Sequence, residues 1–232
     1  MQRPHRPTSA WPTAVATLLV LTLFGWCLYL VTDRMCAWTF DERRANAVMR
    51  GELRADPLSL IDARSQALSA FSAATLEGSA DDVWLVDFFY TRCPSVCQAL
   101  GSEFFRMQEQ LRADSRHAIT VSGQGRVRLL SISLDPEHDT PQALAAYASR
   151  HRADPLVWRV ATPAEPEQGR ALMRRLGVIA IPDGMGGFVH NAGIHVMTSD
   201  GRLLQIAELG AWEQALKHAQ SIVDANACRA AP

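Results

Sequence analysis

A long uncharged segment near the amino terminus divides the chain into two unequal parts. No charged residue occurs between Arg6 and Asp33, and the run over 11–31 is predominantly apolar (WPTAVATLLVLTLFGWCLYLV). A helix of this length crosses a hydrocarbon core of about 30 Å. The sequence therefore predicts a short tail over 1–10, a transmembrane anchor over 11–32, and a separate folded part after it.

The main alternative to an anchor is a cleaved signal peptide. Such a peptide has an apolar core of about 7–15 residues and ends in small residues at its cleavage site. Here the apolar run ends in bulky residues over 28–31 (LYLV), and Cys27 follows Trp26. A lipoprotein signal needs a small residue before its cysteine. We therefore expect the segment to remain in the mature protein.

Charges on either side of the span predict its orientation. Arg3 and Arg6 precede it together with the terminal amine, whereas Asp33 and Arg34 follow it closely. The positive-inside rule then leaves the tail in the cytoplasm and exports the rest of the chain. In a bacterium this is a single-pass inner-membrane protein whose main domain lies in the periplasm, where disulfide bonds can form.

The composition excludes several classes of protein. The chain has 232 residues, of which 48% are hydrophobic and 20% charged, and its formal net charge is -1. This balance is unlike that of a disordered or collagenous protein, and no basic stripe suggests nucleic-acid binding. Because about 150 residues is a usual domain size, we expect a stalk over 33–55 and one domain over 56–232.

Strand and helix patterns alternate along this domain. We expect strands over 82–90, 126–134 and 155–160, and a hairpin of 193–198 and 202–206 around Ser199-Asp200-Gly201. We expect helices over 141–151, 165–176 and 212–225, and one after the first strand whose apolar face is formed by Cys97, Leu100, Phe104, Met107 and Leu111. The segment Asp139-Thr140-Pro141 is typical of a helix start, with Asp139 as a capping residue. The order predicts an α/β, thioredoxin-like fold, with a central mixed sheet flanked by helices.

Two thiols lie at the junction between the first of these strands and its helix. If Pro94 is the first helical residue, Cys93 lies at or beside the cap and Cys97 one turn further in. Residues four apart share a helix face, so the sulfurs can converge on one ion or form one disulfide. The positive end of the helix favours the thiolate form, and thiolates select copper(I) or zinc.

Other roles for this pair remain open from the residues alone. A structural disulfide in an exported domain is the plainest one. Zinc commonly takes four ligands from paired Cys/His clusters, and the sequence has no second cluster. Two thiolates and one imidazole suit copper, provided that the third ligand comes from elsewhere in the chain.

Two further segments complete a recognisable pattern. They are residues 131–141 (SISLDPEHDTP) and His190, which lies eleven residues before Gly201. Together with the cysteines they resemble the Sco/SenC family of membrane-anchored, thioredoxin-like proteins, which help to assemble the copper A centre of cytochrome c oxidase. The resemblance runs from about residue 83 to 224.

The resemblance implies a ligand set and a partner. In this family two cysteines and a distal histidine bind copper, which corresponds here to one copper ion per chain held by Cys93, Cys97 and His190. The implied partner is the copper-bearing subunit of cytochrome c oxidase.

The chain departs from the family pattern at three positions. The family usually has aspartate, proline and aspartate where this chain has Ser95, Gln98 and Val189. The departures remove one carboxylate near the thiols and one near the histidine, as in a divergent paralogue. The three ligands are intact.

Three functions compete. The first is a copper chaperone; the second is a thiol–disulfide oxidoreductase that acts on periplasmic cysteines without copper transfer; the third is an interaction module with a structural disulfide. The first two share one reduced dithiol. A chaperone requires His190 and a reductase does not, and three residues between Cys93 and Cys97, in place of two, favour chelation. The copper-binding function is therefore preferred.

Other residues near these motifs have less specific roles. His195 lies in an apolar hairpin strand, where packing is expected, and His138 lies in a solvated turn. Met185, in the glycine-rich loop over 183–187, is a further soft donor for copper(I). Asp135 follows a buried strand and is either an acid or outer partner near the thiols, or a turn residue bonded to its own backbone.

Three cysteines lie outside the pair. Cys27 lies in the membrane span, where it acts as a small apolar residue. Cys36 and Cys228 lie at the two ends of the exported part, and the ends of a domain often lie close together. They are candidates for a structural disulfide, although Cys36 equally fits a free thiol in the stalk.

Overall fold

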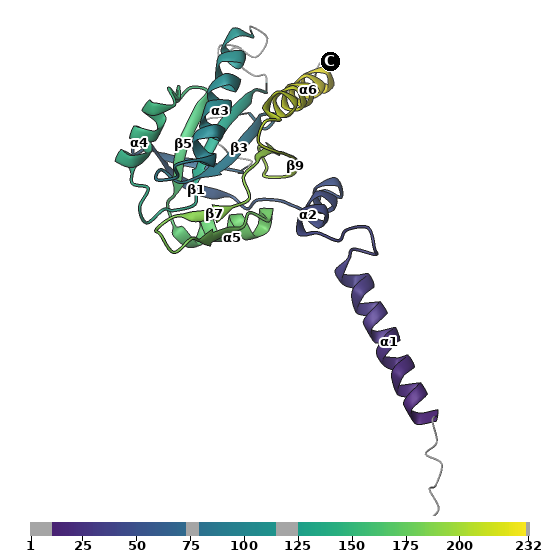
Figure 1. The fold of residues 1–232 in the computed structure, drawn as a ribbon. Helices are drawn as coiled ribbons and strands as arrows, with labels where there is room; N and C mark the ends of the chain where they lie inside the picture. Colours follow the sequence, from purple (N-terminus) through teal and green to yellow (C-terminus); the bar gives the residue numbers. More distant parts are fainter. Residues whose placement is uncertain (1–10, 73–78, 115–124, 231–232) are drawn as a thin grey trace, which may run out of the picture. The chain divides into compact units, whose positions relative to one another are not determined.

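The computed structural model describes residues 11–72, 79–114 and 125–230 (Figure 1). Two compact units follow one another in the sequence, and the boundary lies between Asn46 and Ala47.

The first unit contains helix α1 (Trp11–Val31) and most of helix α2 (Phe40–Met49). Helix α1 is long and apolar enough to cross a membrane. The hydroxyl groups of Thr17 and Thr22 donate to carbonyl oxygens one turn earlier, at 2.9 and 3.0 Å. These bonds satisfy both hydroxyls within the helix, as apolar surroundings require.

Helix α2 lies in the segment that was expected to be an irregular stalk. A capping box begins it: the Glu42 N–H donates to Thr39 Oγ1 at 3.1 Å, and the Thr39 N–H donates to Glu42 Oε2 at 3.0 Å. Thr followed three residues later by Glu is a recognised helix-start pattern, so the sequence did contain a signal for this helix.

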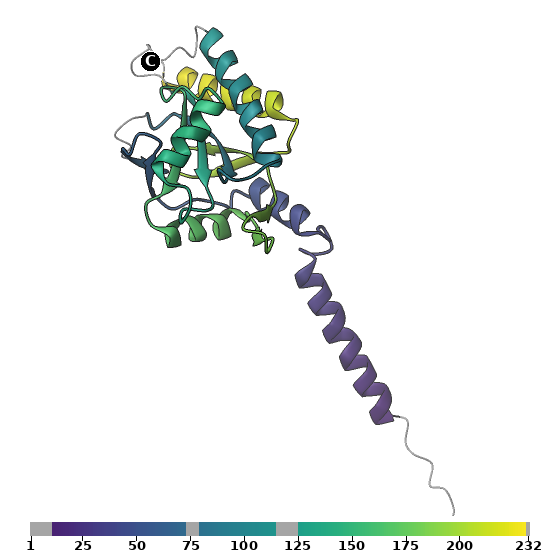
Figure 2. The ribbon, with the colours of Figure 1, turned by 60° about the vertical axis from the view of Figure 1, so that its left-hand side comes forward.

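The second unit is built on a mixed sheet of seven strands in the order β2-β1-β5-β4-β3-β8-β9 (Figures 1 and 2). Its strands are β1 (Leu58–Asp62), β2 (Ala67–Ala70), β3 (Val83–Phe89), β4 (Val127–Ser133), β5 (Trp158–Pro163), β8 (Ile194–Thr198) and β9 (Leu203–Ala207). Strands β3, β4 and β5 are parallel to one another, and the other pairings are antiparallel.

In the described part of the domain, four helices flank this sheet, and two short strands form a separate sheet. The helices are α3 (Val96–Ala113), α4 (Pro141–Arg150), α5 (Pro166–Leu176) and α6 (Trp212–Ala230), and the small sheet pairs β6 (Ala180–Pro182) with β7 (Phe188–His190). Both views show α5 and the β6–β7 hairpin at the same end of the domain. The predicted thioredoxin-like architecture is confirmed.

The predicted order of strands and helices is confirmed from 82 onward, with local differences. Strand β5 begins at Trp158, and not at 155, because the N–H groups of Val157 and Trp158 close a turn on the Asp154 carbonyl. Strands β1, β2, β6 and β7 were not predicted. Residues 53–55, within the expected stalk, bond to the backbone of residues 201–203 beside β9.

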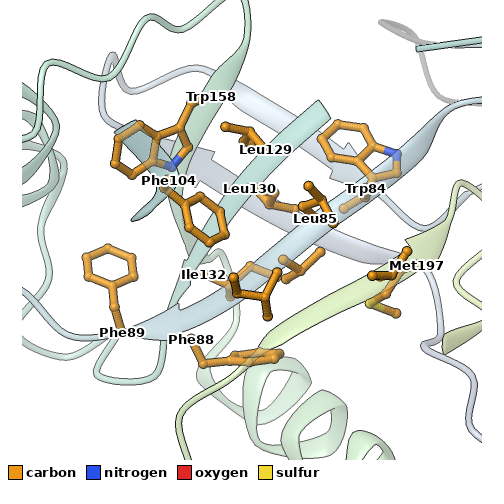
Figure 3. Packing of buried hydrophobic residues seen from close by; sticks show 14 of the residues in the cluster. Trp84, Leu85, Phe88, Phe89, Phe104, Leu129, Leu130, Ile132, Trp158 and Met197 are labelled. Atoms are coloured by element: carbon orange, nitrogen blue, oxygen red, sulfur yellow. The ribbon is translucent and has the colours of Figure 1, made fainter. Parts of the chain in front are cut away.

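In the core, side chains of the central strands β3, β4, β5 and β8 pack together with Phe104 of helix α3 (Figure 3). Every residue of β3 is buried, so this strand has apolar contacts on both faces. On α3 the predicted apolar face is buried along its whole length: Cys97, Leu100, Phe104, Met107 and Leu111. Burial of each large apolar side chain contributes about 1.5–3 kcal/mol, which fixes α3 on the sheet.

The start of helix α4 differs from the prediction. Thr140, and not Asp139, is the capping residue, because its Oγ1 accepts a hydrogen bond from the Ala143 N–H at 3.3 Å. Pro141 occupies the first turn as expected. The Asp139 side chain is fully buried and points elsewhere.

Gly101 on α3 is required by the ring of His151. A Cβ atom at Gly101 would lie 2.6 Å from two atoms of that ring, which packs against the rings of Tyr147 and Trp158. Glycine to alanine in a helix normally adds about 1 kcal/mol of stability. Here we expect Gly101→Ala to lower the free energy of unfolding, because overpacking costs roughly 1–3 kcal/mol. Chemical denaturation of the full chain in detergent measures the change.

The matched control is the same change in a His151→Ala background. Without the ring, alanine at 101 should regain its helical advantage and stabilise the variant. A destabilising effect of the same size in both backgrounds would show that the ring contact is not the cause.

Candidate metal and dithiol site

The first thiol lies in the turn between β3 and α3. Helix α3 begins at Val96, so Pro94 is not its first residue as was predicted. Residues 91–95 form turns, with the Cys93 N–H bonded to the Tyr90 carbonyl at 3.1 Å and Ser95 outside helical geometry. Cys93 thus precedes the helix, and Cys97 is its second residue.

A helix amide connects the two cysteines. The first N–H groups of a helix have no partner within it. Here the Cys97 N–H donates to Cys93 Sγ at 3.4 Å, where a capping oxygen would ordinarily accept. Ser95, the residue at the cap position, makes no such bond with its side chain.

The two thiols differ in acidity. Burial opposes ionisation of Cys93, but hydrogen bonds from the Cys97 thiol and from the Ser95 and Cys97 amides lower the pKa of this thiol. Burial raises the pKa of Cys97, and the neighbouring Cys93 raises it further. Cys93 is therefore the thiol that ionises first.

His190 lies beside the second thiol. It ends strand β7, and its Nε2 lies 3.7 Å from Cys97 Sγ. Burial lowers the pKa of the ring, which favours the neutral form that binds metals. Its Nδ1 is buried and has no hydrogen-bond partner among the residues that the structure describes.

His195, the rival histidine, is a core residue as predicted. It lies on β8 with 1% of its surface exposed. Its Nδ1 lies 3.3 Å from the Val86 carbonyl, and its ring meets Phe88 edge-on at 5.2 Å.

The donor types fit copper, because thiolate sulfur suits copper(I) and imidazole nitrogen suits copper as well. The Cys97–His190 separation of 3.7 Å places one sulfur and one nitrogen side by side. Within the described residues, however, no group of three or more His, Cys, Asp and Glu side chains has the geometry of a formed metal site. Binding would therefore require the side chains to move.

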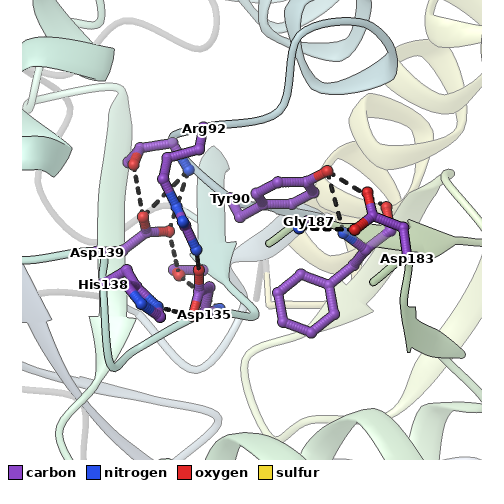
Figure 4. Close-up of polar contacts among 10 residues, drawn as sticks. Tyr90, Arg92, Asp135, His138, Asp139, Asp183 and Gly187 are labelled. Carbon is purple, nitrogen blue, oxygen red and sulfur yellow. Dashed lines mark hydrogen bonds and ion pairs between the residues drawn. The ribbon is translucent and has the colours of Figure 1, made fainter. Parts of the chain in front are cut away.

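Asp139 holds the turn in front of Cys93 (Figure 4). Its carboxylate accepts bonds from the Thr91 N–H at 3.1 Å, the Thr91 hydroxyl at 2.5 Å and the Ser133 hydroxyl at 2.5 Å. These bonds join the cysteine turn to the end of β4. The prediction gave Asp139 a capping role alone and missed this function.

Asp135 contacts the residue next to Cys93, and not the thiol itself. Its carboxylate accepts from Arg92 at 2.7 Å and lies 2.8 Å from His138 Nδ1 (Figure 4). The Arg92 charge is thus paired with Asp135. The backbone carbonyl of Asp135 also accepts bonds from the turn that follows. A role of Asp135 as an acid or outer partner near the thiols stays a prediction.

Asp87 is a buried carboxyl group that the sequence analysis overlooked. It lies on β3 opposite Ser131, and burial raises its pKa to about 7. Its charge is among the influences that raise the pKa of Cys97. The sequence did contain a signal for it, because Asp87 is an acidic residue within an otherwise apolar strand. Such a residue is uncommon in a buried strand unless it has a partner or a function.

The positions that depart from the family pattern have distinct surroundings. The Gln98 amide donates to the Cys93 carbonyl at 3.2 Å, so this side chain supports the cysteine turn. Val189 is 67% exposed, and Met185, at the tip of the hairpin, is 88% exposed.

A cavity of about 320 Å³ opens next to the site. The turn over 133–137, helix α5 and the β6–β7 hairpin line it, with Met173 and Phe188 among its apolar residues.

The remaining cysteines are thiols in the structure. Cys27, Cys36 and Cys228 are all exposed. A disulfide between Cys36 and Cys228 stays a prediction.

Fold and site together define a class of protein. A thioredoxin-like domain with Cys-x₃-Cys between a buried strand and a helix, and with a histidine against the second thiol, is a dithiol protein equipped to bind a soft metal. The SCO1/SenC family model matches residues 54–223, and the chain belongs to this family. The resemblance predicted from the sequence is confirmed.

Two relatives illustrate the range of similarity. One, from Stutzerimonas stutzeri, carries the provisional name of a copper-binding protein and is 31% identical over 193 residues, which cover 81% of this chain and 83% of the relative. The other is the "SCO1 protein homolog" of Bacillus subtilis, 27% identical over 134 residues. That match covers 56% of this chain and 64% of the relative, which is less than two thirds of its length.

Solved structures share the fold. A SCO1/SenC family lipoprotein from Bacillus anthracis has a TM-score of 0.60 and 16% identity, and the match covers 73% of this chain and 95% of that one. Copper-bound ScoI of Bradyrhizobium japonicum has a TM-score of 0.55 and 24% identity, and the match covers 73% of this chain and 99% of that one.

The unequal thiols should titrate separately. In the reduced full chain carrying Cys27→Ser, Cys36→Ser and Cys228→Ser, we expect one thiolate to form at a lower pH than an unperturbed thiol would, because the pKa of Cys93 is lowered. The second should form only in stronger alkali. Ultraviolet thiolate absorption measures both steps.

Single-thiol variants assign the two steps. Cys93→Ser should remove the early step and Cys97→Ser the late one. Two equal steps near the unperturbed value would contradict the acidity that the geometry assigns to Cys93.

Proposed function

We propose that this chain is a membrane-anchored copper-binding protein that holds one copper ion on Cys93, Cys97 and His190. The 3.7 Å approach of His190 Nε2 to Cys97 Sγ carries the proposal. A dithiol that only exchanges disulfides has no need of an imidazole beside its second sulfur, whereas a metal site has.

The chemistry of each ligand supports copper as the cargo. Thiolate sulfur is a soft donor that suits copper(I), and imidazole also suits the divalent ion. The lowered pKa of Cys93 makes one thiolate readily available, and the lowered pKa of His190 keeps its ring neutral. Copper then displaces the proton from Cys97, as metals do from coordinating thiols.

Membership of the SCO1/SenC family supports a partner protein that receives the copper ion. The proposed partner is the copper-bearing subunit of cytochrome c oxidase, to whose copper A site the chain delivers copper or whose thiols it prepares. Copper-bound relatives and the copper-binding relative from Stutzerimonas stutzeri agree with a copper-carrying role.

The unequal thiols favour a second candidate function, a thiol–disulfide oxidoreductase. The Cys93 thiolate would attack a partner disulfide, forming a mixed disulfide and releasing one partner thiolate. Cys97 would then lose its proton and attack Cys93 Sγ, which releases the second partner thiolate. The partner gains two electrons and the chain keeps a Cys93–Cys97 disulfide, which a periplasmic reductant must reduce again.

Anaerobic copper titration of the full chain in detergent tests the copper-binding function. Cys27, Cys36 and Cys228 are replaced by serine in every sample, so that other thiols bind no copper. We expect Cys93→Ser and Cys97→Ser to abolish tight binding, because each removes one of two thiolates. His190→Ala should weaken the binding of copper(II) more than the binding of copper(I), since two thiolates alone can hold the soft monovalent ion.

His195→Ala is the matched histidine control. It should lower the melting temperature through lost packing and leave copper binding nearly unchanged. If His195→Ala loses the copper(II) absorption band and His190→Ala keeps it, the proposed ligand is wrong. Tight binding of copper at wild-type stoichiometry by either serine variant would favour the oxidoreductase.

We further propose that helix α1 anchors the chain in the bacterial inner membrane, with the domain in the periplasm. The uncharged span, preceded by arginines, supports this topology. A reporter fused after residue 232 should be active only if it functions in the periplasm. Activity of a cytoplasm-only reporter would reverse the topology, and release of a soluble mature protein would show cleavage in place of anchoring.

A further inference from the structure

We propose that the Tyr90 hydroxyl is a positioning group that holds strand β7, and with it His190, against the dithiol. The inference rests on the proposed function, because it concerns the placement of a copper ligand. Tyr90 would act through the backbone of Phe188, two residues before His190, and not by touching the metal.

Two hydrogen bonds join Tyr90 to one residue of the hairpin. The phenol donates to the Phe188 carbonyl at 3.3 Å and accepts from the Phe188 N–H at 3.2 Å. Tyr90 is itself fixed, since it is 4% exposed and its carbonyl accepts the Cys93 N–H at 3.1 Å. One side chain therefore connects the cysteine turn to the histidine strand.

The rings on β7 pack on the same side chain. Phe188 meets Tyr90 edge-on at 5.4 Å, and His190 meets it at 6.4 Å. Val189, between them, is 67% exposed. Alternate residues of a strand point to opposite sides, so the inward side of β7 rests on Tyr90.

The hairpin approaches the phenol closely enough to require glycine. A Cβ atom at Gly187 would lie 2.8 Å from the Tyr90 oxygen. Figure 4 shows Tyr90 beside Gly187 and Asp183 of the hairpin loop, on the side of the site away from Asp135.

The hairpin needs such a connection because it is small. Strands β6 and β7 have three residues each and form a sheet apart from the main one, and an isolated two-stranded hairpin is marginally stable. Asn191 bonds to the backbone of Ile179 and Gly177, at the base of the hairpin. Within the described part of the chain, the Tyr90–Phe188 pair and the Cys97–His190 contact are the hydrogen bonds that join residues 180–190 to 90–97.

Tyr90→Phe tests the proposal because it keeps the ring and removes the hydroxyl. Net hydrogen-bond contributions of about 0.5–1.5 kcal/mol correspond to a change of about 2- to 10-fold in an equilibrium constant. In the full chain in detergent, we expect copper(II) binding to weaken by this factor and copper(I) binding to change little. Amide hydrogen exchange over 187–190 should become faster in the metal-free protein by a similar factor.

Tyr147→Phe is the matched control. Its hydroxyl is also buried and also touches the dithiol helix, donating to the Cys97 carbonyl at 3.1 Å. Within the described residues, no hydrogen bond joins this hydroxyl to the hairpin. This variant should leave exchange over 187–190 and the preference for copper(II) as in wild type. The Cys93–Cys97 disulfide should form as readily in both variants.

The outcomes separate the two proposals. Unchanged exchange and unchanged copper(II) affinity in Tyr90→Phe would overturn the positioning role, and so would faster exchange without weaker copper(II) binding. If His190→Ala binds copper(II) as wild type does, the proposed function fails. Faster amide exchange over 187–190 in Tyr90→Phe would still show that the Tyr90 hydroxyl stabilises the hairpin. Equal effects of both tyrosine variants would show a general loss of packing and would also overturn it.

Discussion

The parallel pairing of β3 with β4 is the constraint on which the site depends. It runs in register from Val83 opposite Val127 to Phe89 opposite Ser133, so both strands end at the same edge of the sheet. The cysteine turn leaves β3 at this edge, and the turn with Asp139 leaves β4 there. Because the two turns lie side by side, Thr91 and Ser133 both donate hydrogen bonds to the buried carboxylate of Asp139. These bonds fix the turn that contains Cys93.

Strong local patterns in the sequence predicted most of this arrangement. The buried strand, the apolar face of α3 and the cysteine pair each lie in one continuous segment. The spacing of residues within each segment was therefore enough to predict it. The choice of His190 as a ligand came from resemblance, whereas the apolar strand around His195 by itself indicated a packing role for that residue. The short strands β6 and β7 have too few residues to show a periodic pattern. Their position depends on hydrogen bonds with Tyr90, which is distant in sequence.

The errors at Pro94 and Asp139 have a common cause. Both residues stand in patterns typical of a helix start, and in both cases tertiary bonds decided the outcome. The turn over 91–95 bends so that Thr91 reaches Asp139, which delays the helix to Val96. Asp139 is thereby occupied, and the neighbouring Thr140 caps α4 in its place. Local propensity describes each segment alone, whereas here two segments share one carboxylate.

The separation of the β6–β7 sheet from the main sheet has a kinetic consequence. Both thiols lie on the core of the domain, whereas the histidine lies on a small element with its own few contacts. Local opening of such an element costs only the contacts it breaks, and not the free energy of global unfolding. The residence time of a ligand held partly by that element can therefore be tuned by substitutions in the hairpin while the melting temperature of the domain stays the same. Selection on stability and selection on release would then act on different residues.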